Sequence, residues 1–249
     1  FSEAKKQQFK SLQECFIREL QPHVRPINQS EHIFISPCDS IVGSYGKIED
    51  QTIYQCKGFP YELQELIPDP QLAQKYIGGS YVTLRLTSSM YHRFHAPLDG
   101  NLKSINYISG DTWNVNPIAL KTIEKLFCKN ERAVVEFQPD NHNGSFLLVP
   151  VAAVLVASMK FHCLDENLDM SYCGENIISC DQHYQKGDEF NIEVTWLVDS
   201  VLWIFTTHYV RKEDAVYCFS QQFNLDGTDK GEILLVDKIE VENKRDIGT

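Results

Sequence analysis

The sequence lacks the paired cysteine spacing that would indicate a metal site. None of its eight cysteines forms a Cys-x-x-Cys pair, and the histidines and cysteines of the 162–183 region show no paired ligand spacing either. A chain of 249 residues also buries enough surface to fold without disulfide staples. We therefore expect no metal site, and reduced thiols rather than a disulfide framework.

Long apolar runs and runs of basic residues are missing too. The formal net charge is −11, from 23 Lys and Arg against 34 Asp and Glu, which argues against nucleic acid as a partner. The longest apolar runs are too short or too broken to span a bilayer, so membrane contact stays open but is not indicated. We expect a soluble cytoplasmic or intracellular protein. Since the chain begins with Phe1 rather than Met, a targeting segment can be missing from it.

The helical pattern is confined to a few segments. Apolar residues recur at helical spacing over residues 2–20, which predicts one amphipathic helix closed by Pro22 and Pro26. Shorter helical segments are predicted at Tyr61–Ile67 and Pro117–Phe127, where Pro117 occupies a plausible first-turn position.

Short β-rich runs fill the rest of the chain, bounded by turn signals such as Ser44 to Gly46 and Gly78-Gly79. The predicted strands are His32–Ser36, Ile53–Lys57, Tyr81–Thr87, Leu102–Ile108, Ala133–Phe137, Phe146–Val151, Asn191–Val198, Val201–His208, Ala215–Phe219 and Glu232–Glu240. There is no repeat and no linker. We expect an α+β, β-dominated fold, with the helix and the segment after it at 1–28, one domain at 29–243 and a polar tail at 244–249.

The most informative stretch runs from Gly78 to Phe137. It holds Tyr-His-Arg-Phe-His-Ala-Pro-Leu-Asp-Gly at 91–100, a Gly-x-x-x-x-Val-Asn segment at 110–116 and Asn-Glu-Arg at 130–132. This order of blocks resembles the phosphatidylserine decarboxylases, in which a Tyr-His-Arg-x-His-x-Pro-x-x-Gly block precedes the same two motifs.

Further blocks extend the resemblance over roughly residues 10–205. Arg-Pro-Ile at 25–27, Ser-Pro-Cys-Asp at 36–39 and Lys-Gly at 57–58 are similar to other motifs of the family. Because the order and spacing of many separate blocks agree, chance is a poor explanation for the likeness. The resemblance implies a single phosphatidylserine decarboxylase-like domain.

The resemblance also implies a decarboxylase whose cofactor is a self-derived pyruvoyl group. In the family, an internal serine attacks the preceding carbonyl, and the resulting ester eliminates to leave the pyruvoyl group on the downstream fragment. That group is the electron sink for decarboxylation. The implied substrate is a small amino acid or the amino-acid head group of a phospholipid. The oligomeric state is left open, a homo-oligomer included.

Four residues carry the catalytic roles that the resemblance implies. Asp39 matches the family's orienting aspartate, and His95 matches the base for self-cleavage. His92 matches the histidine that manages protons near the substrate. Ser200 is the candidate pyruvoyl precursor. Histidines three apart on a strand point to opposite faces, so the two rings need not both line a site.

The processing site departs from the family's Gly-Ser-Thr. An ungapped count back from Phe205 places Asp199 at the serine position, whereas a small gap places Ser200 there. The strained backbone conformations of that site cost more free energy for an aspartate than for a glycine.

Three hypotheses follow from the altered processing site. The first is a decarboxylase that cleaves itself at Ser200. The second is an uncleaved, catalytically altered homologue that binds a ligand or a partner protein. The third, and least supported, is a hydrolytic triad of Ser200, His95 and Asp39, because no oxyanion-hole motif accompanies it.

Overall fold

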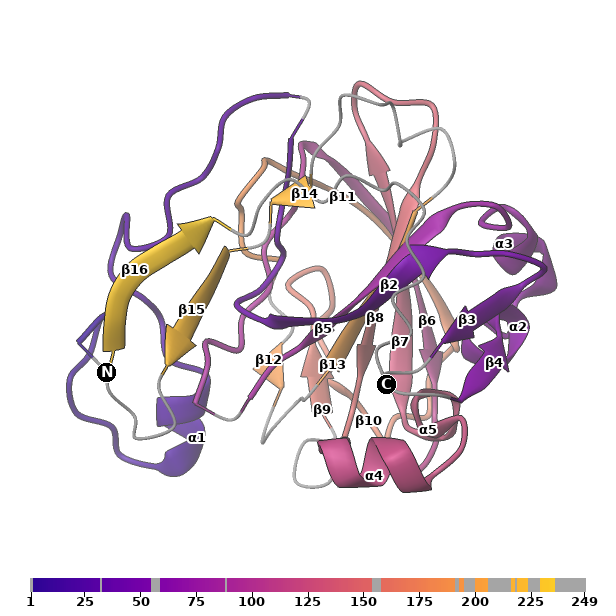
Figure 1. Cartoon of the computed structure of the whole chain (residues 1–249), viewed down its shortest axis with the longest axis horizontal. Helices are drawn as coiled ribbons and strands as arrows, with labels where there is room; N and C mark the ends of the chain where they lie inside the picture. Colours follow the sequence, from indigo (N-terminus) through magenta and orange to yellow (C-terminus); the bar gives the residue numbers. More distant parts are fainter. Residues whose placement is uncertain are drawn as a thin grey trace.

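The computed structural model describes residues 2–31, 33–54, 59–87, 89–153, 158–190, 193–194, 200–205, 216–217, 219–223 and 229–235. Strands dominate this part of the chain and its helices are short (Figure 1). The fold is therefore α+β and β-dominated, as the sequence predicts. The helices are α1 (Leu12–Phe16), α2 (Leu63–Leu66), α3 (Pro70–Gln74), α4 (Pro117–Thr122) and α5 (Leu126–Lys129).

A seven-stranded sheet forms the centre of the structure, in the order β11-β6-β7-β8-β13-β5-β2. Every described pairing between neighbours in this sheet is antiparallel. Its strands are β2 (Ile41–Lys47), β5 (Ser80–Arg85), β6 (Gly100–Ile108), β7 (Arg132–Pro139), β8 (Phe146–Val151), β11 (Ile177–Tyr184) and β13 (Ser200–Phe205).

Smaller sheets flank the central one. They are formed by β1 with β14, β3 with β4, β9 with β10 and β12, and β15 with β16. Their bounds are β1 (Phe34–Ile35), β3 (Thr52–Tyr54), β4 (Pro60–Glu62), β9 (Ser158–Lys160), β10 (Leu168–Asp169), β12 (Glu193–Val194), β14 (Val216–Tyr217), β15 (Phe219–Phe223) and β16 (Asp229–Leu235).

The register of the central sheet brings several strand ends together. Ser200, the first residue of β13, pairs with Val151, the last residue of β8. The next residue of β13 pairs with Leu84 near the end of β5, and Arg85 at that end pairs with Ile41, the first residue of β2. The beginnings of β13 and β2 therefore lie at the same end of the sheet as the ends of β5 and β8.

Both faces of the central sheet are covered. Along β8, Phe146 and Leu148 belong to one apolar cluster, whereas Leu147 and Val149 belong to the other. This alternation follows from the two-residue period of a strand, and its burial on both faces is what a central strand requires. Apolar residues of α2 to α5 pack into the second cluster, so the helices cover that face.

Caps and prolines set where α3 and α4 begin. The Asp69 side chain accepts hydrogen bonds from two backbone amides at the start of α3, and Asn116 does the same for α4. Each cap is followed by proline in the first turn, where the missing N–H is not needed. The prediction for Pro117 is confirmed.

The predicted helix over residues 2–20 is wrong, because α1 covers only Leu12–Phe16. The Ser11 side chain accepts from the Glu14 amide and caps the helix at that point. The residues before it are not helical, and Ala4 forms a β-bridge with Leu20. Backbone pairing with residues 19–21 therefore replaces the first turns of the expected helix.

The turn predicted at Ser44 to Gly46 is also wrong, because these residues lie inside β2. The register of β2 against β5 shifts between Val42 and Tyr45, so the small residues mark a β-bulge. The polar edge strand β11 was not predicted at all. Its mostly exposed residues lack the apolar alternation on which the strand predictions rest.

The other strand predictions overlap observed strands. Residues 32, 55–57, 191–192, 195–198, 206–208, 215, 218 and 236–240 of the predicted strands, and the tail at 244–249, lie outside the described residues. The division of the chain at 28 and 243 stays a prediction. No helix in the described part of the chain is long and apolar enough to cross a membrane.

The aromatic centre of the first cluster gives a direct test of the core. Phe146 is fully buried, stacks on Phe137 at 5.0 Å and meets Phe34 edge-on at 5.7 Å. We expect Phe146→Ala to lower the free energy of unfolding by about 3–5 kcal/mol, because it leaves a cavity between the rings. Urea titration measures the loss. The control Ile118→Ala removes a side chain that is 76% exposed and should be nearly neutral. Equal effects of the two variants would contradict this core.

Candidate active site

A cavity of about 500 Å³ lies where the N-terminal segment meets the histidine block. Its wall combines carboxylates, guanidinium groups and imidazoles with apolar side chains. The polar and charged lining side chains include Glu19, His23, Arg25, Asp39, Tyr91, Arg93, His95, His162 and Glu189. Such a mixture can bind a ligand that carries both charges.

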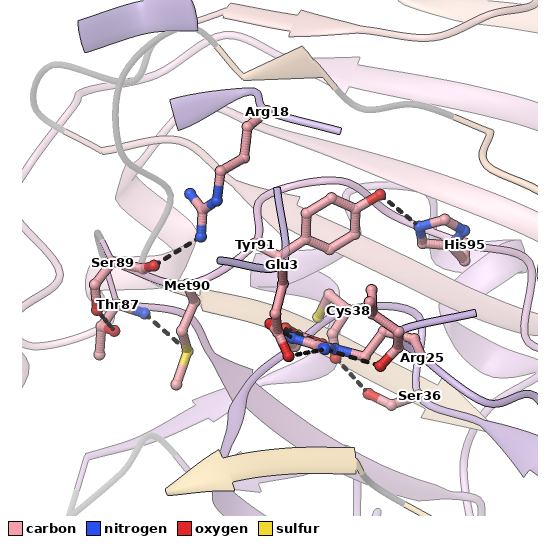
Figure 2. A network of polar contacts seen from close by, with 12 residues as sticks. Glu3, Arg18, Arg25, Ser36, Cys38, Thr87, Ser89, Met90, Tyr91 and His95 are labelled. Carbon is pink, nitrogen blue, oxygen red and sulfur yellow. Dashed lines mark hydrogen bonds and ion pairs between the residues drawn. The ribbon is translucent and has the colours of Figure 1, made fainter. Parts of the chain in front are cut away.

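Arg25 ties the N-terminal segment to the turn before β2. Its guanidinium donates to both oxygens of Asp39, at 2.6–3.1 Å, and to both oxygens of Glu3, at 3.0 and 3.1 Å. Figure 2 shows Arg25 beside Glu3, with Tyr91 and His95 nearby. Burial lowers the pKa of Arg25, but the hydrogen bonds to Asp39 and Glu3 outweigh it and raise that pKa above its ordinary value. Arg25 therefore stays charged and holds Asp39 in place.

The turn that carries Asp39 is held against the histidine block by backbone bonds. The Ser36 hydroxyl donates to the Cys38 carbonyl at 2.7 Å and shapes the turn. The backbone amide of His95 donates to the Pro37 carbonyl at 2.8 Å. Asp39 and His95 are thus positioned by the same short stretch of main chain.

The His95 ring has both nitrogens engaged. Its Nδ1 lies 2.8 Å from the Gly187 carbonyl, which can only accept, so Nδ1 carries the hydrogen. In the neutral ring Nε2 is then an acceptor, and the Tyr91 hydroxyl donates to it at 3.0 Å (Figure 2). Burial raises the pKa of Tyr91, so this hydroxyl keeps its hydrogen at neutral pH. Gly187 has φ +89°, a conformation that favours glycine.

The His92 ring lies in the core and does not line the cavity. It is fully buried and stacks on Phe16 with 3.8 Å between ring centroids. Its Nε2 donates to the Thr87 carbonyl at 2.9 Å, which leaves Nδ1 as a bare acceptor. Within the described residues this buried Nδ1 has no hydrogen-bond partner. Burial lowers the pKa of His92 to about 4, so the ring is neutral at physiological pH.

The four predicted site residues are only partly brought together. Asp39 and His95 line one cavity, but in the described part of the chain the Asp39 carboxylate bonds Arg25 and neither imidazole. His92 is behind the cavity wall. Ser200 begins β13 next to the ends of β5 and β8, and Thr87, which bonds His92, follows two residues after β5. The catalytic roles of all four residues stay predictions.

Other lining residues were part of the motifs but received no role from the sequence. Arg93 donates to Glu189 at 2.6 Å and to the Ile17 carbonyl at 2.8 Å, which fixes the N-terminal segment on the block. His162 lies 3.6 Å from the same Glu189 carboxylate. Arg93 stands inside the quoted block at 91–100, so its position there was the available signal, whereas nothing in the sequence pointed to His162.

The absence of a metal site stays a prediction. The described residues contain no group of three or more His, Cys, Asp or Glu side chains that could hold a metal ion.

The geometry defines a β-dominated domain with a histidine- and carboxylate-lined pocket beside its main sheet. The sequence model of the family described as phosphatidylserine decarboxylase matches residues 12–194. The chain therefore belongs to the phosphatidylserine decarboxylase family. The match ends before Ser200, so it does not cover the candidate processing position.

Curated relatives agree with this assignment. The chain is 40% identical over 153 residues to a phosphatidylserine decarboxylase proenzyme of Vibrio parahaemolyticus, covering 61% of this chain and 53% of the relative. Proenzymes of the same name from Clostridium perfringens and Clostridium novyi are 41% and 43% identical over 152 and 155 residues. These two alignments cover 61% and 62% of this chain, and 51% and 52% of the relatives. The chain thus spans about half the length of the curated relatives it matches.

The hydrogen bonds from the Arg25 guanidinium to Asp39 and Glu3, here called the Arg25 fork, are expected to stabilise the pocket wall. Arg25→Lys keeps the charge but cannot bond two carboxylates in a planar fork, so we expect a loss of about 1–2 kcal/mol in the free energy of unfolding. Chemical denaturation measures it. The matched control Lys5→Ala removes an exposed ion pair with Glu19 and should change stability little. If Arg25→Lys is as stable as the parent protein, the Arg25 fork does not hold the N-terminal segment in place.

Burial of His92 predicts a pH dependence of stability. The pKa is about 4 in the folded protein and 6.5 for the free side chain, so between these values only the unfolded state binds the proton. Stability should fall by up to about 3 kcal/mol as pH drops from 6.5 to 4, with no contribution from this group above 6.5. Urea unfolding at a series of pH values should show this fall flattened in His92→Leu.

The control for this pH dependence is His183→Gln. His183 is an exposed histidine whose pKa is raised by its hydrogen bond to Asp140, so its linkage has the opposite sign. The fall between pH 6.5 and 4 should persist in His183→Gln. An unchanged pH profile in His92→Leu would show that the His92 ring is not buried in its neutral form.

Proposed function

We propose that the chain is a carboxy-lyase that uses a pyruvoyl group formed from Ser200 and acts on the amino-acid head group of phosphatidylserine. Family membership and the relatives named phosphatidylserine decarboxylase proenzyme support this reaction class. A free amino acid is the second substrate class that the pocket allows, because the polar lining does not require a lipid tail.

The observation that carries the proposal is the bare nitrogen of His92. A buried imidazole acceptor without a partner among the described residues is unfavourable for stability, so its retention suggests a use. Ser200 begins a strand whose neighbour β5 leads directly to Thr87, the residue that holds the His92 ring. A hydroxyl that is to attack its preceding carbonyl needs such a base nearby.

The hydrogen bonds of the two rings favour His92 over His95 as the base for self-cleavage. The sequence resemblance implied this role for His95. The basic Nε2 of His95 accepts from the Tyr91 hydroxyl and its Nδ1 donates to a carbonyl, so this ring can take a proton only when the Tyr91 hydroxyl turns away. His92 is neutral and offers Nδ1. In this proposal His95 faces the cavity and manages protons on the substrate side.

Asp39 remains the proposed orienting acid, but in this proposal it positions His95 rather than the base His92, through the turn that Asp39 ends. That turn receives the His95 amide and begins β2 beside the end of β5. The carboxylates of Glu19 and Glu189 give the cavity sites for a substrate ammonium group, whereas Arg93 favours a carboxylate or phosphate. The pyruvoyl group would supply the carbonyl that serves as electron sink.

The alternative is an uncleaved homologue that binds a ligand in the same cavity. The sequence favours it at one point, because Asp199 stands before the serine where the family has glycine. A carboxylate there would lie beside the developing oxyanion and oppose self-cleavage. The polar cavity would then serve for binding alone.

Mass spectrometry of the denatured protein separates the two functions. We expect two fragments, residues 1–199 and 200–249, with the second beginning in a keto acyl group that reacts with hydroxylamine. Ser200→Ala should stay intact, since it removes the attacking hydroxyl. An intact wild-type chain would rule out pyruvoyl catalysis and leave the binding function.

The assignment of the base is tested by two alanine variants. His92→Ala should remain uncleaved, whereas His95→Ala should be cleaved but turn over phosphatidylserine at least about a hundredfold more slowly, the lower end of the range for loss of general acid–base catalysis. The exposed His183→Ala is the control for loss of a histidine and should behave like the parent. Cleavage of His92→Ala together with an intact His95→Ala would restore the assignment made from the sequence.

A further inference from the structure

Two cysteines outside the proposed mechanism lie with their sulfur atoms together. The Sγ atoms of Cys163 and Cys180 are 2.7 Å apart, not far above the roughly 2.05 Å of a covalent S–S bond. Both side chains are partly buried against the first apolar cluster, and both are free thiols. They come from segments that are separate in the sheet topology, so a bond between them would be a true cross-link.

The local backbone allows the two sulfurs to approach. Cys180 lies in the edge strand β11, at the bulge where the register against β6 shifts between Ser179 and Gln182. Cys163 lies in a tight turn after β9, closed by a hydrogen bond from the Leu164 amide to the Phe161 carbonyl at 3.0 Å. A bulged edge strand and a surface turn can adjust by small movements, because neither is fixed by sheet pairing on both sides.

The two thiols are electrostatically unequal. The hydrogen bond from Cys180 lowers the pKa of Cys163, since it stabilises the thiolate. The same bond, with burial, raises the pKa of Cys180. The thiolate is the nucleophile in disulfide exchange, so Cys163 is suited to attack first and Cys180 to resolve the mixed disulfide.

We propose that Cys163 and Cys180 form a redox-modification site that exchanges with low-molecular-weight disulfides such as oxidised glutathione. The Cys163 thiolate attacks one sulfur of the small disulfide, forms a mixed disulfide and releases one small thiolate. Cys180 then loses its proton and attacks Cys163, which forms the intramolecular disulfide and releases the second small thiol. The protein loses two electrons and two protons, and the small disulfide gains them.

The site borders the candidate pocket. His162, the residue before Cys163, lines the cavity, and its amide donates to the Phe190 carbonyl. Oxidation would link the turn that carries His162 covalently to β11 and so restrict the movement of that turn. The inference does not rest on the proposed decarboxylase function, because it uses only the geometry of the two thiols.

Peptide mapping of the whole chain tests the proposal. The reduced protein is equilibrated with glutathione buffers of increasing oxidised fraction, quenched with acid, alkylated and digested after acidic residues. Glu166, Asp169 and Glu175 lie between the cysteines and allow the digest to separate Cys163, Cys173 and Cys180. We expect the Cys163 and Cys180 peptides to appear joined, lighter by two hydrogen atoms than the two free thiols, before Cys173 is modified. Full alkylation of both at every ratio would overturn the proposal.

Serine variants test the order of attack. In Cys180→Ser the glutathione adduct should accumulate on Cys163, because the resolving thiol is gone, whereas in Cys163→Ser the remaining Cys180 should stay largely unmodified. The control is Cys173→Ser, which removes an exposed thiol that donates to the Ser171 carbonyl and should leave the cross-link unchanged. An adduct on Cys180 in Cys163→Ser, with none on Cys163 in Cys180→Ser, would contradict the roles assigned to the two thiols.

Discussion

The placement of β13 between β8 and β5 is the constraint on which the site depends. Ser200 is near the C-terminal end of the described chain, yet its strand pairs on both sides within the central sheet. Antiparallel register then sets its first residue beside the ends of β5 and β8 and near the beginning of β2. Residues from three distant parts of the sequence meet there because strand pairing, rather than sequence proximity, decides which ends are neighbours.

The two histidines of one motif have different environments for a simple physical reason. His92 lies in the core, where it stacks on Phe16 and loses the solvent that would stabilise its charge. His95 belongs to the pocket wall, and the Gly187 carbonyl and the Tyr91 hydroxyl decide its tautomer. Buried polar atoms that lack partners are uncommon in folded proteins, and this is the ground on which we propose a use for the His92 nitrogen. Arg25 holds another part of the same cavity wall, since it binds both Asp39 and Glu3 of the N-terminal segment.

Much of the β framework could be predicted from the sequence, because strands such as β7 and β8 combine apolar runs with clear turn signals. The N-terminal helix could not, since the pairing of Ala4 with Leu20 is a tertiary event that overrides helical periodicity. Motif resemblance found Asp39 and both histidines, yet it could not tell which ring is buried, because that depends on Phe16 and Thr87 from outside the block. Arg25 stood in a recognised motif without a role, and Cys163 and Cys180 showed no spacing that would pair them.

The central claim is that a buried, neutral His92 starts the self-cleavage of the chain at Ser200. The most direct measurement is the rate of cleavage of freshly translated precursor across pH 4 to 8, followed by the appearance of the C-terminal fragment. A base with a pKa of about 4 is already neutral over most of this range. The account predicts a rate that is flat from about pH 5 to 8 and falls only below that. A rate that rises through pH 6.5, the ordinary pKa of histidine, or a precursor that stays whole at every pH, would contradict it.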